Sequence, residues 1–456
     1  MAKTFEGGIH PHDAKERTRA LALREAPLPE TAIIPLRQHI GAPCRAIVKR
    51  GDTVRTGQPV GEAQGFVSAP VHATVTGKVK KVDLAPHPIT GKGEPAVIVE
   101  RSGDDEWFEG VNEARDASGL DADALRQIIS AAGIVGMGGA TFPTHVKLSP
   151  PADMKINAVI LNAAECEPYL TCDERLMLER PQDIIEGMRI VQRILGEAEG
   201  LIGVESNKPE AFEALRDAAA GDDRLRVEMV EVRYPQGAEQ QLIKALLGRE
   251  VPWRGGLPMH VGAVVQNVGT MIAVYEAVTR GMPLIRRALT VTGDAVGNPM
   301  NVIARIGTPI GTLLGEAQVS DDAAKLICGG PMMGIAQWTD EAPVLKGTSG
   351  ILLLRDPGKA VPGPCIRCGS CLRVCPLRLI PADFSRAIEA EAFDVARDYN
   401  VLECKECGCC AYVCPSRRPI IQQVKVAKGE LMRRDAEERA RQKEEEARRA
   451  GAAEAD

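Results

Sequence analysis

The sequence predicts a multidomain protein that combines β modules, an α/β domain and a small α-helical domain rich in cysteine. Its 456 residues exceed what one hydrophobic core usually organises, since domains commonly contain about 100 to 200 residues. Short Val and Ile runs separated by Gly and Pro fill the first quarter of the chain, and helix-like and strand-like segments alternate in the middle. Nine of the 13 cysteines fall within residues 365–414. These three patterns require different architectures, so we expect several domains.

The composition is that of an ordinary globular protein. Apolar residues make up 44% and charged residues 26%, and 56 basic residues stand against 62 acidic ones, a balance of −6. The sequence has no basic stripe with interleaved aromatic residues, so nucleic acid is not an expected partner. The N-terminal stretch lacks the apolar run of a secretory signal, and no run approaches the roughly 18 apolar residues of a membrane span. We expect a cytoplasmic protein that reaches a membrane only through partners or its surface.

Six segments can be separated by these patterns. In the middle, ADALRQIISAAG and GAEQQLIKALLG are helix-like, and INAVILNAA and LIGVES are strand-like. Next, strand-like runs surround GTPIGTLLGEA, which fits one helix, and the C-terminal MRRDAEERARQKEEEARRA fits an exposed helix or a partly disordered tail. The predicted segments are an N-terminal arm (1–30), a β module (31–101), an α/β domain (120–283), a compact β-rich module (284–356), a cysteine domain (357–425) and a charged tail (426–456).

The cysteine domain contains the pattern C-x-x-C-x-x-C-x-x-x-C-P twice. The two runs are Cys365, Cys368, Cys371 and Cys375, and Cys404, Cys407, Cys410 and Cys414. Thiolates are soft ligands, and the two-residue gaps allow one short loop to reach three corners of a cubane. Zinc is the alternative, but two complete runs that end in proline favour two 4Fe–4S clusters. Helical periodicity between the runs predicts helices there.

In bacterial two-cluster ferredoxins the fourth cysteine of each run binds the other cluster. The expected ligand sets are Cys365, Cys368, Cys371 with Cys414, and Cys404, Cys407, Cys410 with Cys375. Cys409 is then left over. We expect the remaining cysteines to be buried small hydrophobic residues, namely Cys44, Cys166, Cys172 and Cys328.

A glycine-rich loop follows the first helix-like stretch of the α/β domain. Residues 133–144 read GIVGMGGATFPT and include Gly136, Gly138 and Gly139, with Lys147 shortly after. Such a loop can turn tightly and direct backbone N–H groups at an anion. It matches neither G-x-x-x-x-G-K-[ST] nor G-x-G-x-x-G after a strand, which disfavours the usual ATP and Rossmann sites. An ordinary glycine-rich loop without a ligand is the alternative.

The first β module resembles the lipoyl and biotinyl carrier barrel. The resemblance lies in KRGDTVRTGQPVGEA followed by VSAPVHATVTGKV. In carrier barrels a lysine at a hairpin tip carries the prosthetic group, whereas Ser68, Ala69 and Pro70 lie near that tip here. We therefore expect a docking or scaffold module rather than a swinging arm.

Nearly the whole chain, including its FEGGIHP opening, resembles the C subunit of the Rnf (Rsx) electron transport complex. Its middle is also similar to the FMN- and NADH-binding subunit of respiratory complex I, in which GRGGAGFPTG, NADESEPG and GEE segments surround FMN and NADH. The corresponding segments here are GMGGATFPTH, NAAECEPY and GAEQ. The module after residue 284 resembles the soluble-ligand-binding β-grasp (SLBB) domain of these relatives, and the cysteine domain an α-helical two-cluster ferredoxin.

The resemblance implies a set of cofactor contacts. The FMN phosphate and ring edge would be held by Gly136, Gly138, Gly139 and Lys147. Asn162 and Glu165 would contact the flavin. The phosphate pocket would be completed by Gln266, Asn267 and Thr270. Phe142 would stack on the nicotinamide, and Glu167 and Glu239 would bind polar groups of the dinucleotide.

Three departures from the related pattern concern the same segments. Met137 stands where the loop arginine is found, Ala164 replaces the aspartate of NADESEPG, and Ala238 replaces the first glutamate of GEE. These substitutions favour FMN binding over NADH binding.

The resemblance implies a peripheral subunit on the cytoplasmic side of the cell inner membrane. It would belong to an ion-translocating ferredoxin:NAD oxidoreductase complex with other subunits, including an iron–sulfur subunit, and would reach ferredoxin through the complex. A flavin suits this role because it exchanges hydride with NAD(H) and passes single electrons to clusters. The alternatives are a soluble flavin and iron–sulfur reductase of the cobalamin-reductase type, and a non-catalytic electron-transfer and docking subunit that no longer binds NAD(H).

Overall fold

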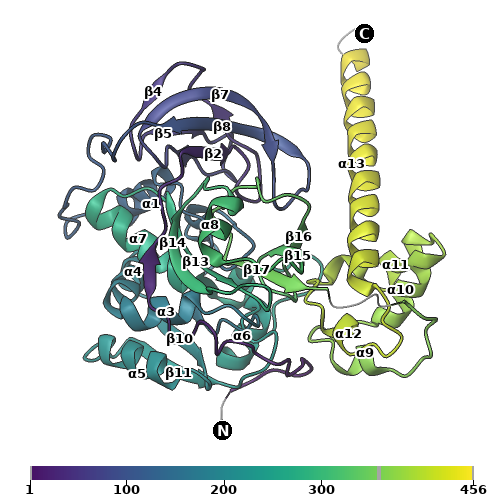
Figure 1. The fold of residues 1–456 in the computed structure, drawn as a ribbon. Helices are drawn as coiled ribbons and strands as arrows, with labels where there is room; N and C mark the ends of the chain where they lie inside the picture. The colour runs from purple at the N-terminus through teal and green to yellow at the C-terminus, as the bar shows by residue number, and fades with distance from the viewer. Residues whose placement is uncertain (1–2, 357–360, 454–456) are drawn as a thin grey trace. The chain divides into compact units, whose positions relative to one another are not determined.

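The computed structural model describes residues 3–356 and 361–453 (Figure 1). Residues 1–2, 357–360 and 454–456 of the predicted arm, cysteine domain and tail lie outside the described residues. The chain forms two compact units, and each is described by itself. The large unit comprises Met1–Thr4 and His10–Pro357, and the small unit comprises Phe5–Ile9 and Gly358–Asp456.

The first β module of the large unit consists of two antiparallel sheets around one core. Val54, Val60, Val75 and Val97 are fully buried members of that core. The four-stranded sheet has the order β2-β8-β7-β4, with β2 (Thr31–Pro35), β8 (Gly93–Arg101), β7 (Gly77–Pro86) and β4 (Thr53–Val54). The three-stranded sheet has the order β3-β5-β6, with β3 (Arg45–Ala46), β5 (Pro59–Glu62) and β6 (Val71–His72). Alternating Val and Ile residues thus give the predicted barrel-like module.

The α/β domain contains a parallel sheet with helices on both faces. The strand order is β11-β10-β9-β12, with β9 (Ala158–Ala163), β10 (Glu199–Glu205), β11 (Leu225–Val230) and β12 (Ala263–Asn267). Val159 and Leu161 of β9 join the core under α1 (Ala122–Ala131), α4 (Pro181–Ile194) and α7 (Val268–Arg280), whereas Ile160 joins the core under α6 (Glu239–Leu247). Both faces of a parallel sheet are buried, which explains the continuous apolar run AVIL. The remaining helices are α2 (Thr144–Lys147), α3 (Cys172–Glu179), α5 (Pro209–Ala218) and η1 (Pro258–Val261).

The third part of the large unit is a mixed sheet covered by one helix. Its order is β1-β14-β13-β17-β15-β16, with β1 (Leu23–Glu25), β13 (Arg286–Thr292), β14 (Met300–Arg305), β15 (Ala323–Cys328), β16 (Ile335–Gln337) and β17 (Gly350–Arg355). The predicted helix is α8 (Ile310–Ala317), which buries Ile310 and Leu313 in the core of this module. Strand β1 comes from the N-terminal arm and pairs in parallel with β14. The sequence pattern did not predict β1.

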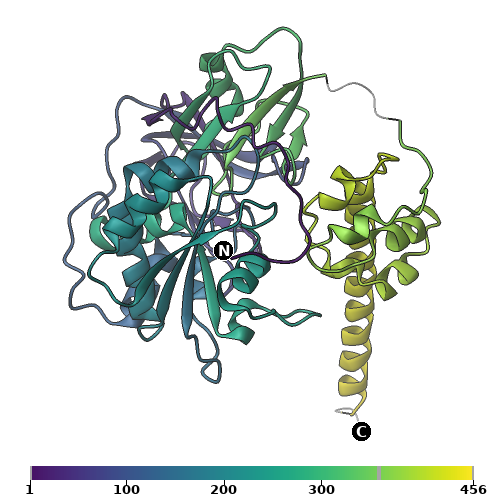
Figure 2. The same cartoon turned by 90° about the horizontal axis from the view of Figure 1, so that it is seen from below.

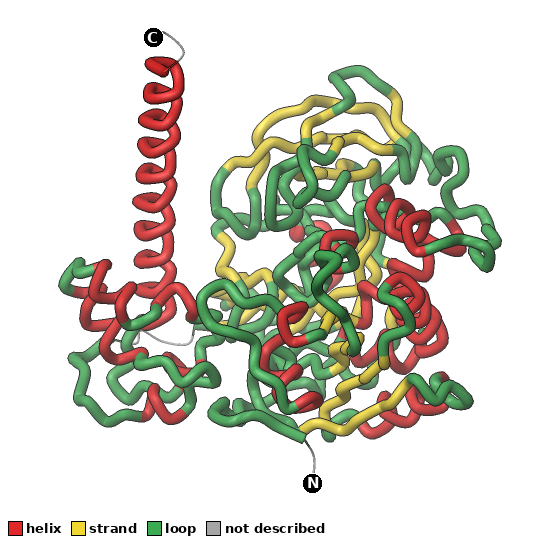
Figure 3. The backbone as a smooth tube through the Cα atoms, turned by 180° about the vertical axis from the view of Figure 1, so that it is seen from behind, coloured by secondary structure: helices red, strands yellow, loops and turns green. Residues whose placement is uncertain are grey.

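The small unit is helical (Figures 2 and 3). Its elements are α9 (Ser370–Arg373), α10 (Pro381–Glu389), α11 (Phe393–Asp398), η2 (Val401–Glu403), α12 (Cys409–Tyr412) and α13 (Ile420–Ala453). Helices α10 and α11 lie between the two cysteine runs, as predicted. Phe384, Ile388 and Ala396 pack with Val424 and Leu431 of α13. The rest of α13 extends beyond the other helices of this unit (Figure 2). None of the helices in the described part of the chain is long and apolar enough to cross a membrane.

These elements confirm the predicted fold class of β modules, an α/β domain and a helical cysteine domain. Close packing of α4 on α7 fixes the start of α7, at the end of β12. A Cβ atom added at Gly187 of α4 would lie 2.0 Å from the carbonyl oxygen of Met271 in α7. Only hydrogen fits there.

We expect Gly187→Ala to lower the free energy of unfolding by about 1–3 kcal/mol, the usual cost of overpacking. The matched control is Gly315→Ala in α8, where an added Cβ atom meets no atom within 4 Å. That change should raise helix stability by up to about 1 kcal/mol. Thermal unfolding of both variants tests this expectation, and an equal melting temperature for the two would contradict it.

Candidate functional site

The candidate site lies at the carboxyl edge of the parallel sheet. Strands β9 and β12 are neighbours, and Asn162 pairs with Asn267 at their ends. From β9 the chain proceeds to β10 and β11 on one side, whereas β12 lies on the other side. Open α/β sheets bind ligands where the strand order reverses in this way. Asn162, Gln266 and Asn267 therefore occupy the expected position for ligand contacts.

The glycine-rich loop lies at this edge and is closed at its base. Val135 and Pro143 form a β-bridge, and the N–H of Gly136 donates to the carbonyl of Phe142 at 2.8 Å. An added Cβ atom at Gly138 would lie 3.7 Å from the Cβ of Asn267. At Gly139, which has φ +110°, an added Cβ atom would meet no atom of the described residues within 4 Å. The exposed Gly138 and Gly139 thus border open space beside the start of α7. We call this part of the loop the glycine cradle, because a ligand could approach its backbone closely.

The loop is fixed by side chains from α7 and β13. The N–H of Met137 donates to Thr270 Oγ1 at 2.9 Å, and Arg287 Nη1 donates to the carbonyl of Met137 at 2.9 Å. Arg287 is buried and also donates to the carbonyl of Lys346 at 2.8 Å. The Thr270 hydroxyl therefore accepts a hydrogen bond from the loop. Nothing in the sequence indicated that Arg287 of the β-rich module also holds the loop.

Lys147 contacts Glu239 at the start of α6, and Asn162 contacts the segment that precedes α6. Lys147 Nζ lies 2.9 Å from Glu239 Oε1 and donates to the carbonyl of Val265 at 3.1 Å. Asn162 Nδ2 donates to the carbonyl of Gly237 at 2.7 Å. Ala238 occupies the N-cap of α6 and provides no side-chain cap. The structure thus pairs Lys147 with Glu239, two predicted contact residues from separate segments, and links Asn162 to Gly237.

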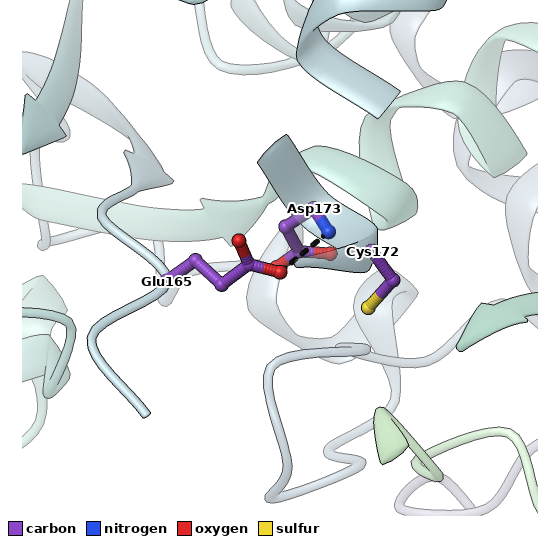
Figure 4. Close-up of side chains that lie close together, drawn as sticks. All are labelled: Glu165, Cys172 and Asp173. Carbon is purple, nitrogen blue, oxygen red and sulfur yellow. Dashed lines mark hydrogen bonds between the residues drawn. The ribbon is translucent and has the colours of Figure 1, made fainter. Parts of the chain in front are cut away.

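Glu165 is buried and caps a helix. Its carboxylate accepts the N–H of Asp173 at 2.6 Å and that of Glu174 at 3.1 Å, in the first turn of α3 (Figure 4). Burial raises the pKa of Glu165 to about 7, against the opposing charge of Lys15. A predicted flavin contact from Glu165 would have to share a carboxylate that already has these partners.

Glu165, Cys172 and Asp173 form a compact group whose ligand atoms lie within 4.8 Å of one another. Each already has a protein partner. Asn267 Nδ2 donates to Asp173 Oδ2 at 2.7 Å, and Cys172 Sγ donates to the carbonyl of Ser349 at 3.3 Å. Helix capping and these bonds explain the group without a metal ion.

Glu167 contacts the β-rich module. Its carboxylate accepts the N–H of Met333 at 2.7 Å and that of Met332 at 3.2 Å. Burial raises the pKa of Glu167 to about 7. A contact with a dinucleotide would have to replace one of these bonds.

Two buried amide side chains provide a test of whether a polar ligand fits. Among the described residues, neither side-chain polar atom of Gln266 has a hydrogen-bond partner, and the same holds for Gln236. Gln266 directly precedes Asn267, and Gln236 directly precedes Gly237. Buried polar groups normally have partners. Together with the open glycine cradle, these amides fit a bound flavin nucleotide. Gln236 lies next to the GAEQ segment, but no sequence pattern distinguished it as a candidate contact.

The tip of the first β module seats against the base of the glycine-rich loop. Lys346 Nζ donates to the carbonyl of Pro70 at 2.8 Å and to that of Gly133 at 2.7 Å. Burial lowers the pKa of Lys346 to about 8. Ala69 belongs to the hydrophobic core of the α/β domain. The hairpin tip is therefore a fixed support of the loop, in line with a scaffold role.

The cysteines of the small unit influence one another's pKa within and between the two runs. Burial raises the pKa of Cys371, and the charges of Cys365 and Cys368 add to the increase. Burial raises the pKa of Cys375, to which Cys407 and Cys371 also contribute. It likewise raises the pKa of Cys404 to about 11, with Cys407 and Cys375 contributing.

Charges of thiols from both runs therefore act on Cys375. The N–H of Leu379 points to Cys375 Sγ at 3.3 Å, and that of Glu406 to Cys404 Sγ at 3.4 Å. Thiolate ligands of iron–sulfur clusters commonly accept such bonds. The donor set of two four-cysteine runs fits two 4Fe–4S clusters. Outside these runs, Cys44, Cys172 and Cys328 are buried, whereas Cys166 is half-buried and accepts the N–H of Gly237 at 3.2 Å.

Three family models match the chain. The Nuo51 FMN-binding domain matches residues 129–276, the RnfC barrel sandwich hybrid domain matches residues 3–104, and the 4Fe-4S dicluster domain matches residues 359–415. The chain thus contains an FMN-binding domain and a domain for two iron–sulfur clusters.

Three similar proteins match over most of their own length. The C subunit of the proton-translocating ferredoxin:NAD(+) oxidoreductase complex of Clostridium ljungdahlii is 46% identical, over 94% of this chain and 94% of that protein. The C subunit of the Na(+)-translocating ferredoxin:NAD(+) oxidoreductase complex of Acetobacterium woodii is 46% identical, over 94% and 97%. The C subunit of the ion-translocating oxidoreductase complex of Rhodobacter capsulatus is 40% identical, over 95% and 84%.

We expect Lys346→Met to weaken FMN binding, because the two carbonyls that anchor the loop and the hairpin tip would lose their shared donor. An unsatisfied buried group costs about 1–3 kcal/mol, and about 1.4 kcal/mol corresponds to tenfold in affinity. The dissociation constant should therefore rise about tenfold in a fluorescence titration of flavin-depleted protein. Lys325→Met, at an exposed position of β15, is the control, and equal affinities of the two variants would refute the anchoring role.

Proposed function

Because this chain belongs to the family of C subunits of ion-translocating ferredoxin:NAD(+) oxidoreductase complexes, we propose that it exchanges hydride with NAD(H) through FMN and passes single electrons through two 4Fe–4S clusters. One observation carries this proposal. The same chain combines a glycine cradle with unpartnered buried amides at the edge of a parallel sheet and two four-cysteine runs in a helical unit. A two-electron site and a single-electron path are the parts that such a reaction needs.

The proposed FMN site combines the loop, the strand ends and α7. Its residues are Gly136, Gly138, Gly139, Lys147, Asn162, Glu165, Gln266, Asn267 and Thr270. When bound, FMN would supply the conversion between hydride and single-electron transfer. Lys147 would bring a positive charge towards the phosphate if its bond with Glu239 were exchanged for one with the ligand. Phe142 would stack on the nicotinamide, with Glu167 and Glu239 as candidate dinucleotide ligands.

We propose the crossed ligand sets for the clusters. The first set is Cys365, Cys368, Cys371 and Cys414, and the second is Cys404, Cys407, Cys410 and Cys375. The second set is supported by the charge of Cys407, which adds to the increase that burial causes in the pKa of Cys375; Cys371 of the first run also contributes. The predicted domain boundaries belong to the same proposal.

The named relatives are subunits of complexes that move ions. By that relation we propose a peripheral position on the cytoplasmic side of the inner membrane. The proposed partners are other subunits of the complex, including an iron–sulfur subunit, and ferredoxin would be reached through the complex.

A second candidate function is an electron-transfer and docking subunit that does not bind NAD(H). The engaged carboxylates of Glu167 and Glu239 favour it, because both already have protein partners. The loss of carboxylates at Ala164 and Ala238 points in the same direction.

Anaerobic titration with NADH separates the two functions. We expect about one FMN and about eight iron atoms per chain, with NADH bleaching the flavin and reducing the clusters in the same titration. The visible spectrum reports both cofactors. Full iron and FMN content without any spectral response to NADH would establish the docking function instead.

We expect Cys375→Ala to remove one cluster and lower the iron content to about half, since it removes one of four ligands. The remaining cluster should show the environment of the first run in an electron paramagnetic resonance spectrum. Cys409→Ala is the control, because Cys409 is buried but stands outside both ligand sets. An iron content that falls equally in both variants would speak against the proposed ligand set.

A further inference from the structure

The FEGGI segment near the N-terminus belongs to the cysteine-containing unit. Phe5–Ile9 groups with the small unit, whereas Met1–Thr4 and the chain from His10 onward group with the large unit. The family match of residues 3–104 assigns the same segment to the barrel domain. The structure therefore adds a separate stretch of chain to the unit that contains the cysteine runs.

The segment contacts the end of the first cysteine run through its backbone. The N–H of Gly8 donates to the carbonyl of Val374 at 2.9 Å. A Cβ atom added at Gly7 would lie 2.9 Å from the carbonyl oxygen of Cys375 and 3.2 Å from that of Val374. Glu6 and Arg378 form an exposed ion pair on the same turn. The segment thus lies directly on the turn that carries the fourth cysteine.

Gly7 meets two requirements that exclude a side chain. Its φ of +83° lies in the left-handed region, and its Cα approaches the Cys375 carbonyl too closely for a Cβ atom. Either condition alone favours glycine, and the second ties the choice to this contact.

The contacted turn also orients the Cys375 thiolate. The N–H of Arg378 donates to the carbonyl of Cys375 at 3.1 Å, and the N–H of Leu379 points to Cys375 Sγ at 3.3 Å. Hydrogen bonds to sulfur and shielding from solvent set the stability and the reduction potential of an iron–sulfur cluster. A segment that packs on this turn therefore affects both the stability and the reduction potential of the cluster.

We propose that Phe5–Ile9 is a built-in part of the site of the cluster that Cys375 ligates, with Gly7 and Gly8 as positioning residues for the Cys375 turn. The inference rests on the proposed ligation of Cys375. It assigns the segment a role in cluster chemistry rather than in the fold of the barrel.

Gly7→Ala in the complete, cluster-loaded chain tests the proposal. The matched control is Gly221→Ala, because Gly221 has the same φ of +83°, but an added Cβ there meets no atom of the described residues within 4 Å. We expect Gly7→Ala to lose one of the two clusters, with iron content falling towards half, or to shift the midpoint potential of one cluster while the other is unchanged. Gly221→Ala should keep both clusters at their original potentials. Equal behaviour of the two variants overturns the proposal.

A measurement on the unmodified protein decides the case in which Gly7→Ala fails to fold. Hydrogen–deuterium exchange of the cluster-loaded chain should show protection at Gly8, whose N–H is bonded to Val374, and removal of the clusters should abolish it. Rapid exchange at Gly8 in the loaded chain overturns the proposal. The iron content of the unmodified protein separately tests whether the clusters are present, so the failure of that premise is distinguishable.

Discussion

Two buried lysine amines hold the loop between β9 and α3, on which the architecture of the candidate site depends. Lys15 Nζ donates to the carbonyls of Glu165 at 2.9 Å and Glu167 at 3.1 Å, and also to that of Leu170. Lys208 Nζ donates to the carbonyl of Ala164 at 2.7 Å and to Glu205 Oε2 at 3.0 Å. A loop without regular structure would otherwise bury several unpaired carbonyls, which is costly. The lysines satisfy them and fix where the neighbouring carboxylates lie.

The same principle extends the site beyond the domain that bears it. Lys15 comes from the arm, Arg287 from β13, and Lys346 from the segment that precedes β17. Each is a buried cation that binds main-chain carbonyls of the α/β domain. Buried charges are stable only when such partners are in place. The glycine-rich loop and the loop between β9 and α3 are therefore held by residues from outside the α/β domain. In the sequence, those residues belong to segments that look like separate modules.

The sequence predicted the local features well, because they depend on short-range patterns. Two-residue cysteine spacing, the alternating Val97 and Val99 of β8, and the continuous apolar run of β9 are visible without a partner. Asn162 and Asn267, which remain proposed flavin contacts, pair at the ends of β9 and β12 because neighbouring parallel strands end at one edge of a sheet. Glu165 remains a proposed flavin contact, and its carboxylate also caps α3, a role that depends on how the loop folds back.

Long-range contacts were not predictable in the same way. Lys15 lies 150 residues from Glu165 in the chain, and no periodicity connects the two. Strand β1 has three residues, and only β14 provides its pairing partner within the described chain. The FEGGI segment lies far in sequence from Cys375. The need for glycine at position 7 becomes clear only from its close approach to the Cys375 carbonyl in the folded chain.

Met137, Ala164 and Ala238, which depart from the related flavin-site pattern, differ in how much they change the site. Met137 is buried against α7, where an added Cβ at Gly269 would lie 3.1 Å from Met137 Cε. Its side chain thus faces the core, while Thr270 and Arg287 hold its N–H and carbonyl. A positively charged side chain therefore still contacts the backbone of residue 137, but it is Arg287 of β13. Ala164 and Ala238 place a methyl group where the related pattern has a carboxylate. The question of NAD(H) recognition therefore rests on these two alanines and on whether Glu239 can exchange its Lys147 partner for a ligand.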